Sequence, residues 1–128
     1  MDAADTSRVL AALGHEGRLL IFRLLVQAGS EGLPAGEVAR RAAQLQNTTS
    51  SNLSVLANVG LVASRREGRS IIYAVNATPF RDALTFITAR FFDSPDVRRE
   101  PSAQRLLAVA RRPRAGRPAR PDRSHDVA

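Results

Sequence analysis

The stretch between residues 46 and 73 limits the possible folds of this chain more than any other part of it. It starts with small polar residues, continues through two leucines at helical spacing, and ends in a basic segment interrupted by a glycine. In order, these residues are Asn47, Thr48, Thr49, Ser50, Ser51, Asn52, Leu53, Leu56, Gly60, Arg65, Arg66, Gly68 and Arg69. This succession predicts a short helix with a polar surface, followed by a tight β-hairpin with a positively charged tip.

The predicted helix covers residues 47–59 and has one inward face. On a period of 3.6 residues Thr49, Leu53 and Leu56 share that face, which we expect to pack on the preceding helices. Gly60 supplies the signal that ends the helix. Short hydroxyl and amide side chains remain for the outer surface of the first turns: Asn47, Thr48, Ser50, Ser51 and Asn52.

The predicted hairpin consists of strands at residues 62–66 and 69–75. Glu67 and Gly68 join them, because a glycine in this pair permits the positive φ of a tight turn. One glutamate among three arginines leaves the tip net positive, and these arginines are Arg65, Arg66 and Arg69.

Three helices are predicted before this stretch. The first is capped by Asp5 or Thr6 and ends near Leu13. The second covers residues 15–28, and its apolar side chains nearly encircle it, so we expect it to be buried on most sides. The third starts at Pro34, where the missing N–H costs nothing; just before it, Leu33 is expected to contribute a token strand residue.

The last predicted helix of the folded domain covers residues 79–92. Its apolar stripe is too large for so small a domain to cover, and a partner helix is therefore expected there: Phe80, Leu84, Ile87 and Phe91. The sequence thus divides into a domain at residues 1–93, a linker with a short helix at 94–111, and an Arg/Pro-rich disordered tail at 112–128. The fold class is mainly α with a small β-hairpin, in the order of four helices, two strands and one helix.

The net charge of +7 favours a nucleic acid as partner, because all 19 basic residues are arginine and arginine forms bidentate contacts with phosphate and guanine. Arginine-biased codon usage is the alternative explanation. Residues 111–128 hold six arginines and two aspartates, a net charge of +4, which leaves +3 for residues 1–110. The tail is either an electrostatic arm for DNA or a tolerated extension.

Together the polar helix and the basic hairpin predict a winged helix-turn-helix that binds double-stranded DNA. The helix would read the major groove, where the Asn52 amide matches adenine, and the hairpin would contact phosphates or the minor groove. A polar cluster can also be only a capped helix start, and a charged hairpin tip only solvated. Their close succession favours DNA. The alternative is a winged-helix module for protein–protein interaction.

Several classes of function are excluded by composition and pattern. The chain has no cysteine, which excludes disulfides and thiolate metal sites. It shows no nucleophile paired with a base, no paired carboxylates and no glycine-rich phosphate loop, so we predict neither an enzyme nor a bound cofactor. No apolar run is long enough to cross a membrane and no signal peptide is recognised, which predicts a cytoplasmic protein.

Residues 9 to about 92 resemble the ArsR/SmtB family of bacterial transcriptional repressors. The resemblance lies in an ordered set of segments that spans two thirds of the chain: 10–14, 18–21, 33–39, 46–56, 60–62 and 65–73. It implies a homodimer in which the first and last helices pair across a two-fold axis, through Val9, Leu10, Leu13, Phe80, Leu84, Ile87 and Phe91. It also implies binding to an inverted-repeat operator, and release when an inducer binds.

Two features depart from that family. Family members usually carry a histidine where this chain has Asn52, so the base preference stays open. Members also sense metals through cysteines or through Asp, His and Glu on the last helix. Here His15 and His125 have no companion at ligand spacing, and Asp82 and Asp93 lie too far apart for one ion, so no metal site is predicted.

An effector of another kind is therefore considered. Aromatic residues gather at the expected dimer interface, and a small apolar or aromatic molecule, or a protein, could bind there: Phe80, Phe86, Phe91 and Phe92. The favoured alternative is that these phenylalanines form the dimer core.

Overall fold

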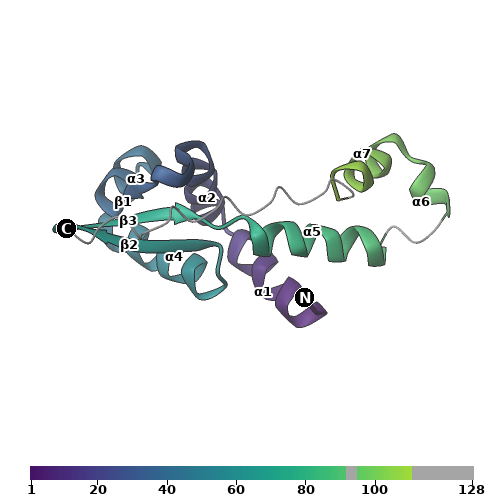
Figure 1. The fold of residues 1–128 in the computed structure, drawn as a ribbon, viewed down its shortest axis with the longest axis horizontal. Helices are drawn as coiled ribbons and strands as arrows, with labels where there is room; N and C mark the ends of the chain where they lie inside the picture. Colours follow the sequence, from purple (N-terminus) through teal and green to yellow (C-terminus); the bar gives the residue numbers. More distant parts are fainter. Residues whose placement is uncertain (92–94, 111–128) are drawn as a thin grey trace, which may run out of the picture.

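The computed structural model describes residues 1–91 and 95–110 (Figure 1). Its elements follow in the order α1 (Ala3–Leu13), α2 (Glu16–Ala28), the 3-10 turn η1 (Gly29–Glu31), β1 (Leu33–Pro34), α3 (Ala35–Ala42), α4 (Gln46–Asn58), β2 (Val62–Glu67), β3 (Ser70–Val75), α5 (Thr78–Phe91), α6 (Pro95–Arg99) and α7 (Pro101–Ala110). The fold is mainly helical with a small sheet, as predicted. Expectations for Phe92, Asp93, His125 and the tail lie outside the described residues.

The sheet has three antiparallel strands in the order β1-β3-β2. Leu33 pairs with Tyr73, so the predicted token strand is real and makes the hairpin part of a larger sheet. Gly32 precedes that strand with φ +68°, and a Cβ there would lie 2.3 Å from the Tyr73 carbonyl oxygen. Only glycine allows the two backbones to approach so closely.

The hairpin turn lies one residue later than predicted. Glu67 pairs with Ser70, so the two-residue loop consists of Gly68 and Arg69 rather than Glu67 and Gly68. Gly68 has φ +60° at the first loop position. A glycine with positive φ there produces a turn whose twist matches that of the strands.

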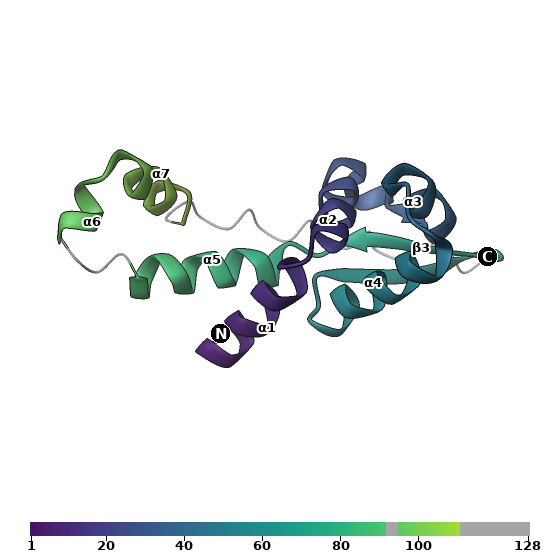
Figure 2. The ribbon, with the colours of Figure 1, turned by 180° about the vertical axis from the view of Figure 1, so that it is seen from behind.

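The core lies between α2, α3, α4 and the sheet, where α2 contacts β3, α3 contacts β1 and β3, and α4 contacts β2 (Figures 1 and 2). The helices cover one face of the sheet, because Ile72 on that face is buried whereas Ile71 on the other face is 48% exposed. Ile21 and Leu25 of α2 are completely buried there. The expectation that α2 is buried on most sides is wrong, however, because Leu19 and Val26 are about half exposed. The elements that pack on α2, namely α1, α3, α4, β3 and η1, leave one side of it open.

Two helix starts differ from the prediction. The α1 helix begins at Ala3, and its cap is Asp2, whose carboxylate accepts the Asp5 N–H at 2.7 Å. Pro34 lies in β1 and occupies the cap position of α3 instead of its first turn.

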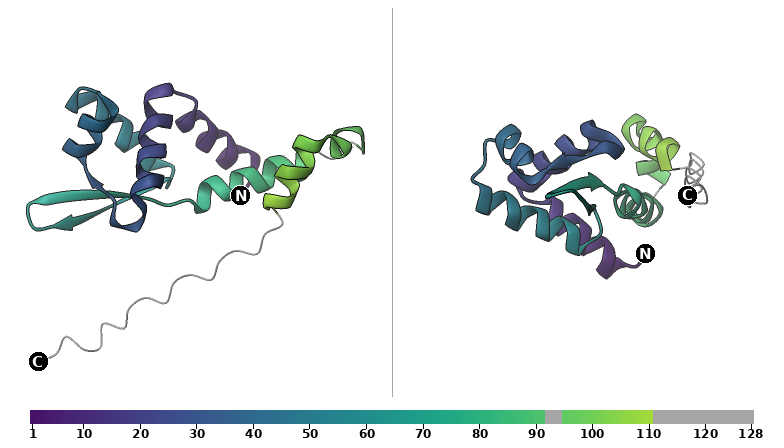
Figure 3. Two further views of the ribbon diagram at one scale, coloured as in Figure 1. Left: turned by 90° about the horizontal axis from the view of Figure 1, so that it is seen from above. Right: turned by 60° about the vertical axis from the view of Figure 1, so that its left-hand side comes forward.

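The hairpin and the C-terminal helices lie at opposite ends of an elongated molecule (Figure 3). Where a linker with one short helix was expected, the structure has α6 and α7, and α7 packs against α5 through the buried Ala103. Among the described residues, no helix is long and apolar enough to span a bilayer.

Candidate nucleic-acid interface

The outer surface of α4 is polar and uncharged in its first two turns. Asn47, Thr48, Ser50 and Ser51 are exposed, as predicted from the helical period. The opposite face is held in the core by side chains that are completely buried: Thr49, Leu53 and Leu56. Small polar groups on so firmly anchored a helix can approach a groove of DNA closely without an opposing charge.

The N-terminus of α4 has open backbone donors. Leu45 is the cap residue, its side chain makes no cap hydrogen bond, and the first turn contains no acidic residue. The first N–H groups of the helix therefore remain available, and together with the helix dipole they favour a phosphate at this end.

Asn52 does not lie on this surface. Its side chain is only 6% exposed, and its Nδ2 donates to Gln44 Oε1 at 3.3 Å. The prediction that Asn52 reads adenine is therefore wrong for this structure: the residue lies three positions after Thr49, on the flank of the helix that turns into the core. Asn52 is therefore not part of the exposed polar surface of α4.

Gln44 is the residue that sequence reasoning missed. It lies in the turn between α3 and α4, and its Nε2 donates to the Gly17 carbonyl of α2 at 3.1 Å. The sequence offers only a weak signal for it, an amide side chain in an otherwise apolar turn between Ala43 and Leu45.

The hairpin of β2 and β3, called the wing below, carries three arginines that have different surroundings. Arg65 donates from Nη1 and Nη2 to the carbonyls of Ser30 and Glu31, at 3.1 and 2.6 Å, and from Nε to Glu67 at 2.8 Å. Arg66 and Arg69 are exposed and form no hydrogen bond or ion pair within the described part of the chain. The structure thus brings two of the three predicted arginines to the surface as free cations and uses the third as a strap.

The alternation of side chains explains this division. Arg65 opposes Ile72 across the ladder, on the face of the sheet that η1 borders. Arg66 opposes Ile71 on the other face. Neighbouring arginines on one strand therefore point to different surroundings.

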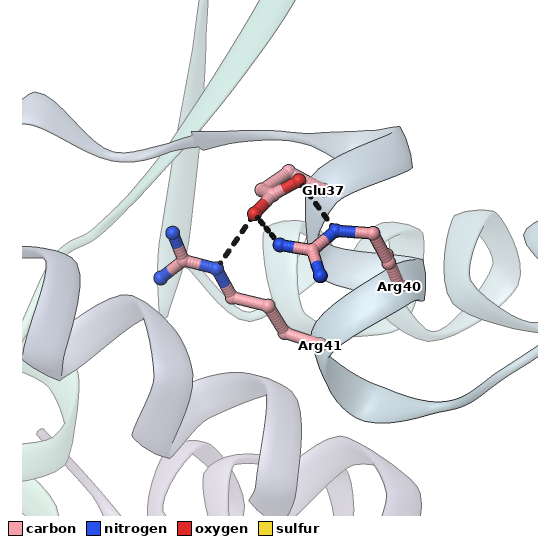
Figure 4. A network of polar contacts seen from close by, with 3 residues as sticks. All are labelled: Glu37, Arg40 and Arg41. Atoms are coloured by element: carbon pink, nitrogen blue, oxygen red, sulfur yellow. Dashed lines mark hydrogen bonds and ion pairs between the residues drawn. The ribbon is translucent and has the colours of Figure 1, made fainter.

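An exposed cluster of charged side chains lies on α3. Glu37 binds both Arg40 and Arg41: Arg40 Nε donates to Oε2 at 3.0 Å, Arg41 Nε donates to Oε1 at 2.9 Å, and Arg40 Nη2 contacts Oε1 as well (Figure 4). These hydrogen bonds, first from Arg40 and then from Arg41, lower the pKa of Glu37 to about 2. The sequence shows this cluster as a glutamate followed by arginines at helical spacings of three and four.

The residues predicted for a dimer interface separate into three groups. Val9 and Leu13 are buried in the core of the same chain, where a partner cannot reach them. Phe80 is half-buried and packs on Phe22 with ring centroids 5.4 Å apart. Leu84 is half-buried. The others line an open apolar groove of about 540 Å³ between α1 and α5, formed by Ala3, Thr6, Ser7, Leu10, Ala11, Phe86, Ile87 and Phe91.

Potential metal ligands do not gather in the part of the chain that the structure describes. No group of three or more His, Asp or Glu side chains is close enough there to hold an ion. The complete sequence contains no cysteine that could add a ligand.

Comparison with known proteins gives related sequences, although no family model matches the chain. The HTH-type transcriptional regulator YgaV of Escherichia coli is 34% identical over 73 residues, which cover 57% of this chain and 72% of that protein. The HTH-type transcriptional regulator NmtR of Mycobacterium tuberculosis is 38% identical over 76 residues, which cover 59% of this chain but only 61% of NmtR.

Solved structures share the fold. An ArsR-like transcriptional regulator from Rhodococcus sp. RHA1 superposes with a TM-score of 0.63 at 24% identity, over 83% of this chain and 90% of that chain. The homodimeric winged helix-turn-helix DNA-binding domain Mb0332 of Mycobacterium bovis, a possible ArsR-family regulator, gives a TM-score of 0.55 at 26% identity, over 73% and 84% of the two chains. The predicted winged helix-turn-helix is therefore confirmed.

Proposed function

This chain belongs to the ArsR family of winged helix-turn-helix transcriptional regulators, and we propose that it is a homodimeric repressor of an inverted-repeat operator. It is a transcriptional regulator and not an enzyme, in agreement with its relatives. The observation that carries the proposal is that α4 has an exposed polar surface on one side and completely buried side chains on the opposite side.

In this proposal the first turns of α4 enter the major groove. Thr48, Ser50 and Ser51 contact base edges, and Asn47 lies near the open N–H groups that receive a phosphate. Arg66 and Arg69 of the wing contact phosphates or the adjacent minor groove. Arg65 holds the wing in place from the side of η1.

The proposed dimer forms through the groove between α1 and α5. Leu10 is 46% and Phe91 68% exposed there, and a second copy would cover both. Mb0332 supports this arrangement because that related domain is homodimeric. A two-fold dimer reads two half-sites about one helical turn of DNA apart, which explains an inverted repeat.

Selection from a random double-stranded DNA library tests the proposal without knowledge of the operator. The wild-type protein is expected to enrich an inverted repeat, and Phe91→Glu, which places a charge in the dimer groove, is expected to enrich single half-sites. Ser51→Glu should lose more than about tenfold in affinity, because it opposes the DNA charge. Ser102→Glu adds the same charge on exposed α7 and should leave binding unchanged.

Two results would contradict the proposal. If no sequence is enriched and the residual binding is insensitive to salt, the result supports the alternative function, a winged-helix module for protein–protein interaction. If a sequence is enriched but binding of the protein to that sequence increases transcription in a reconstituted assay, the protein is an activator rather than a repressor.

A further inference from the structure

The turn between α3 and α4 directs one polar side chain inward. Ala43 and Leu45 are exposed, Leu45 by 77%, while Gln44 between them is half-buried. Ala43 adopts the left-handed conformation with φ +51°, which ends α3 and turns the chain toward α4. The backbone thus places the Gln44 amide against the N-terminal turn of α2.

That amide connects two helices through both of its ends. Its Nε2 donates to the Gly17 carbonyl of α2 at 3.1 Å. Its Oε1 accepts from Asn52 Nδ2 of α4 at 3.3 Å. It also lies 3.5 Å from the Thr49 hydroxyl, which donates instead to the Leu45 carbonyl at 3.1 Å. Asn52 is 6% exposed, so water cannot easily replace Gln44 as its partner.

The space around the amide is fitted to it. A Cβ at position 17 would lie 3.0 Å from Gln44 Nε2 and 3.3 Å from Asn52 Nδ2. Glycine at position 17 therefore allows the two amides to reach the backbone of α2. The same turn of α2 is fixed on its other side, where Arg18 Nε donates to the Ala12 carbonyl of α1 at 2.6 Å.

These contacts hold the rotation of α4 about its own axis. Successive residues of a helix are separated by about 100°, so the side chains that face inward fix which ones face outward. Asn52 and Thr49 flank Ser50 and Ser51 in sequence. A small rotation that released the Gln44 contacts would move Ser51 away from its present direction.

We propose that Gln44 is a positioning residue for DNA recognition, which sets the rotation of α4 by tying Asn52 to the Gly17 carbonyl. The proposal rests on the proposed role of α4 in reading DNA. Gln44 touches no base in this scheme; it determines which bases Ser50 and Ser51 reach. Sequence discrimination therefore depends on it more than nonspecific binding does.

The test uses substitutions of nearly equal volume. Gln44→Met removes both hydrogen bonds of the amide, and the double variant with Asn52→Leu replaces the polar pair by an apolar one. Leaving one buried partner unpaired is costly, whereas replacing both partners is nearly neutral. The double variant should therefore regain thermal stability. Gln27→Met, on the exposed side of α2, is the matched control.

The measured quantity is the ratio of Kd values for a scrambled duplex and for the DNA that the wild-type protein selects, at a temperature where all variants are folded. Gln44→Met should lower this ratio about tenfold, mainly through weaker specific binding, since loss of a buried hydrogen bond has that order of effect. The double variant should keep the low ratio although its Tm recovers. Gln27→Met should retain the wild-type ratio.

Three outcomes would overturn the proposal. The first is that the ratio of Kd values stays at the wild-type value in Gln44→Met. The second is that this ratio recovers together with Tm in the double variant, which would show that Gln44 contributes to stability alone. A wild-type protein that selects no DNA would overturn this proposal and the proposed function together, and the first two outcomes leave the proposed function intact. If Gln44→Met does not fold, Gln44→Glu replaces it, since it keeps the acceptor for Asn52 and loses the donor to Gly17.

Discussion

The helix α4 and the wing, the hairpin of β2 and β3, are the two elements that we propose contact DNA, and they differ in what holds them in place. Thr49, Leu53 and Leu56 anchor α4 in the core and are completely buried. On β2 only Val62 is buried, and the wing is held from the side by the hydrogen bonds of Arg65, which is itself exposed. The comparison shows that α4 is anchored by apolar packing, whereas the hairpin has one buried residue on each strand, Val62 and Ile72, and polar contacts of Arg65 at the surface.

The largest expected effect concerns the anchor of α4. Leu53→Ala should lower the free energy of unfolding by about 2–5 kcal/mol, because it removes a buried side chain and leaves a cavity. Ile71→Ala on the wing, where the side chain is 48% exposed, should change it by less than about 0.5 kcal/mol. Urea denaturation followed by circular dichroism measures both. Equal losses would contradict the difference in anchoring.

A smaller effect separates the arginines of the wing. Arg69→Ala should weaken binding of the selected DNA and reduce the salt slope by about 1, whereas Arg69→Lys should keep most of the affinity because a phosphate contact needs mainly charge. Arg65→Lys should behave like Arg65→Ala, since lysine cannot bridge the carbonyls of Ser30 and Glu31 while it binds Glu67. Fluorescence anisotropy over a salt series distinguishes these cases. If Arg65→Lys binds as the wild type does, Arg65 acts as a charge and not as a strap.

The smallest effect belongs to the cluster on α3. Because the folded-state pKa of Glu37 lies at about 2, below its ordinary value of 4.5, the carboxylate adds stability above pH 4.5 and loses it as the pH falls toward 2. Thermal unfolding of Glu37→Gln should therefore approach that of the wild type over this range. The contacts are exposed, so high salt should reduce the difference at neutral pH as well. A difference that stays constant with pH would mean that the ion pairs do not contribute.

Much of the surface that we propose faces DNA could be predicted from the helical period and the hairpin signal. Thr49, Leu53 and Leu56 were assigned to the core and Ser50 and Ser51 to the surface, because a helix repeats every 3.6 residues wherever it lies. Asn52 was assigned wrongly since periodicity places it on the border of the two faces. In the structure Asn52 faces inward and donates a hydrogen bond to Gln44, which lies outside the helix.

The helices at the ends of the domain show a similar limit. The stripe of α5 was recognised, but the period could not tell that Phe80 faces Phe22 of the same chain while Phe91 points to solvent. One apolar stripe can serve an internal core at one end and an open groove at the other. The positions of α1 and α2 relative to α5 decide which end of the stripe is buried and which end stays exposed.

By itself the sequence determined the class of fold, the helix that faces outward with small polar groups, the basic hairpin and the absence of thiolate chemistry. These follow from local periods, turn residues and composition, which act over a few positions. Only the tertiary structure decided that Arg65 is a strap, that Asn52 is buried, and that Gln44 joins α4 to α2. Those three contacts connect residues 8 to 35 positions apart, and no local pattern reports which distant carbonyl or amide a side chain will meet.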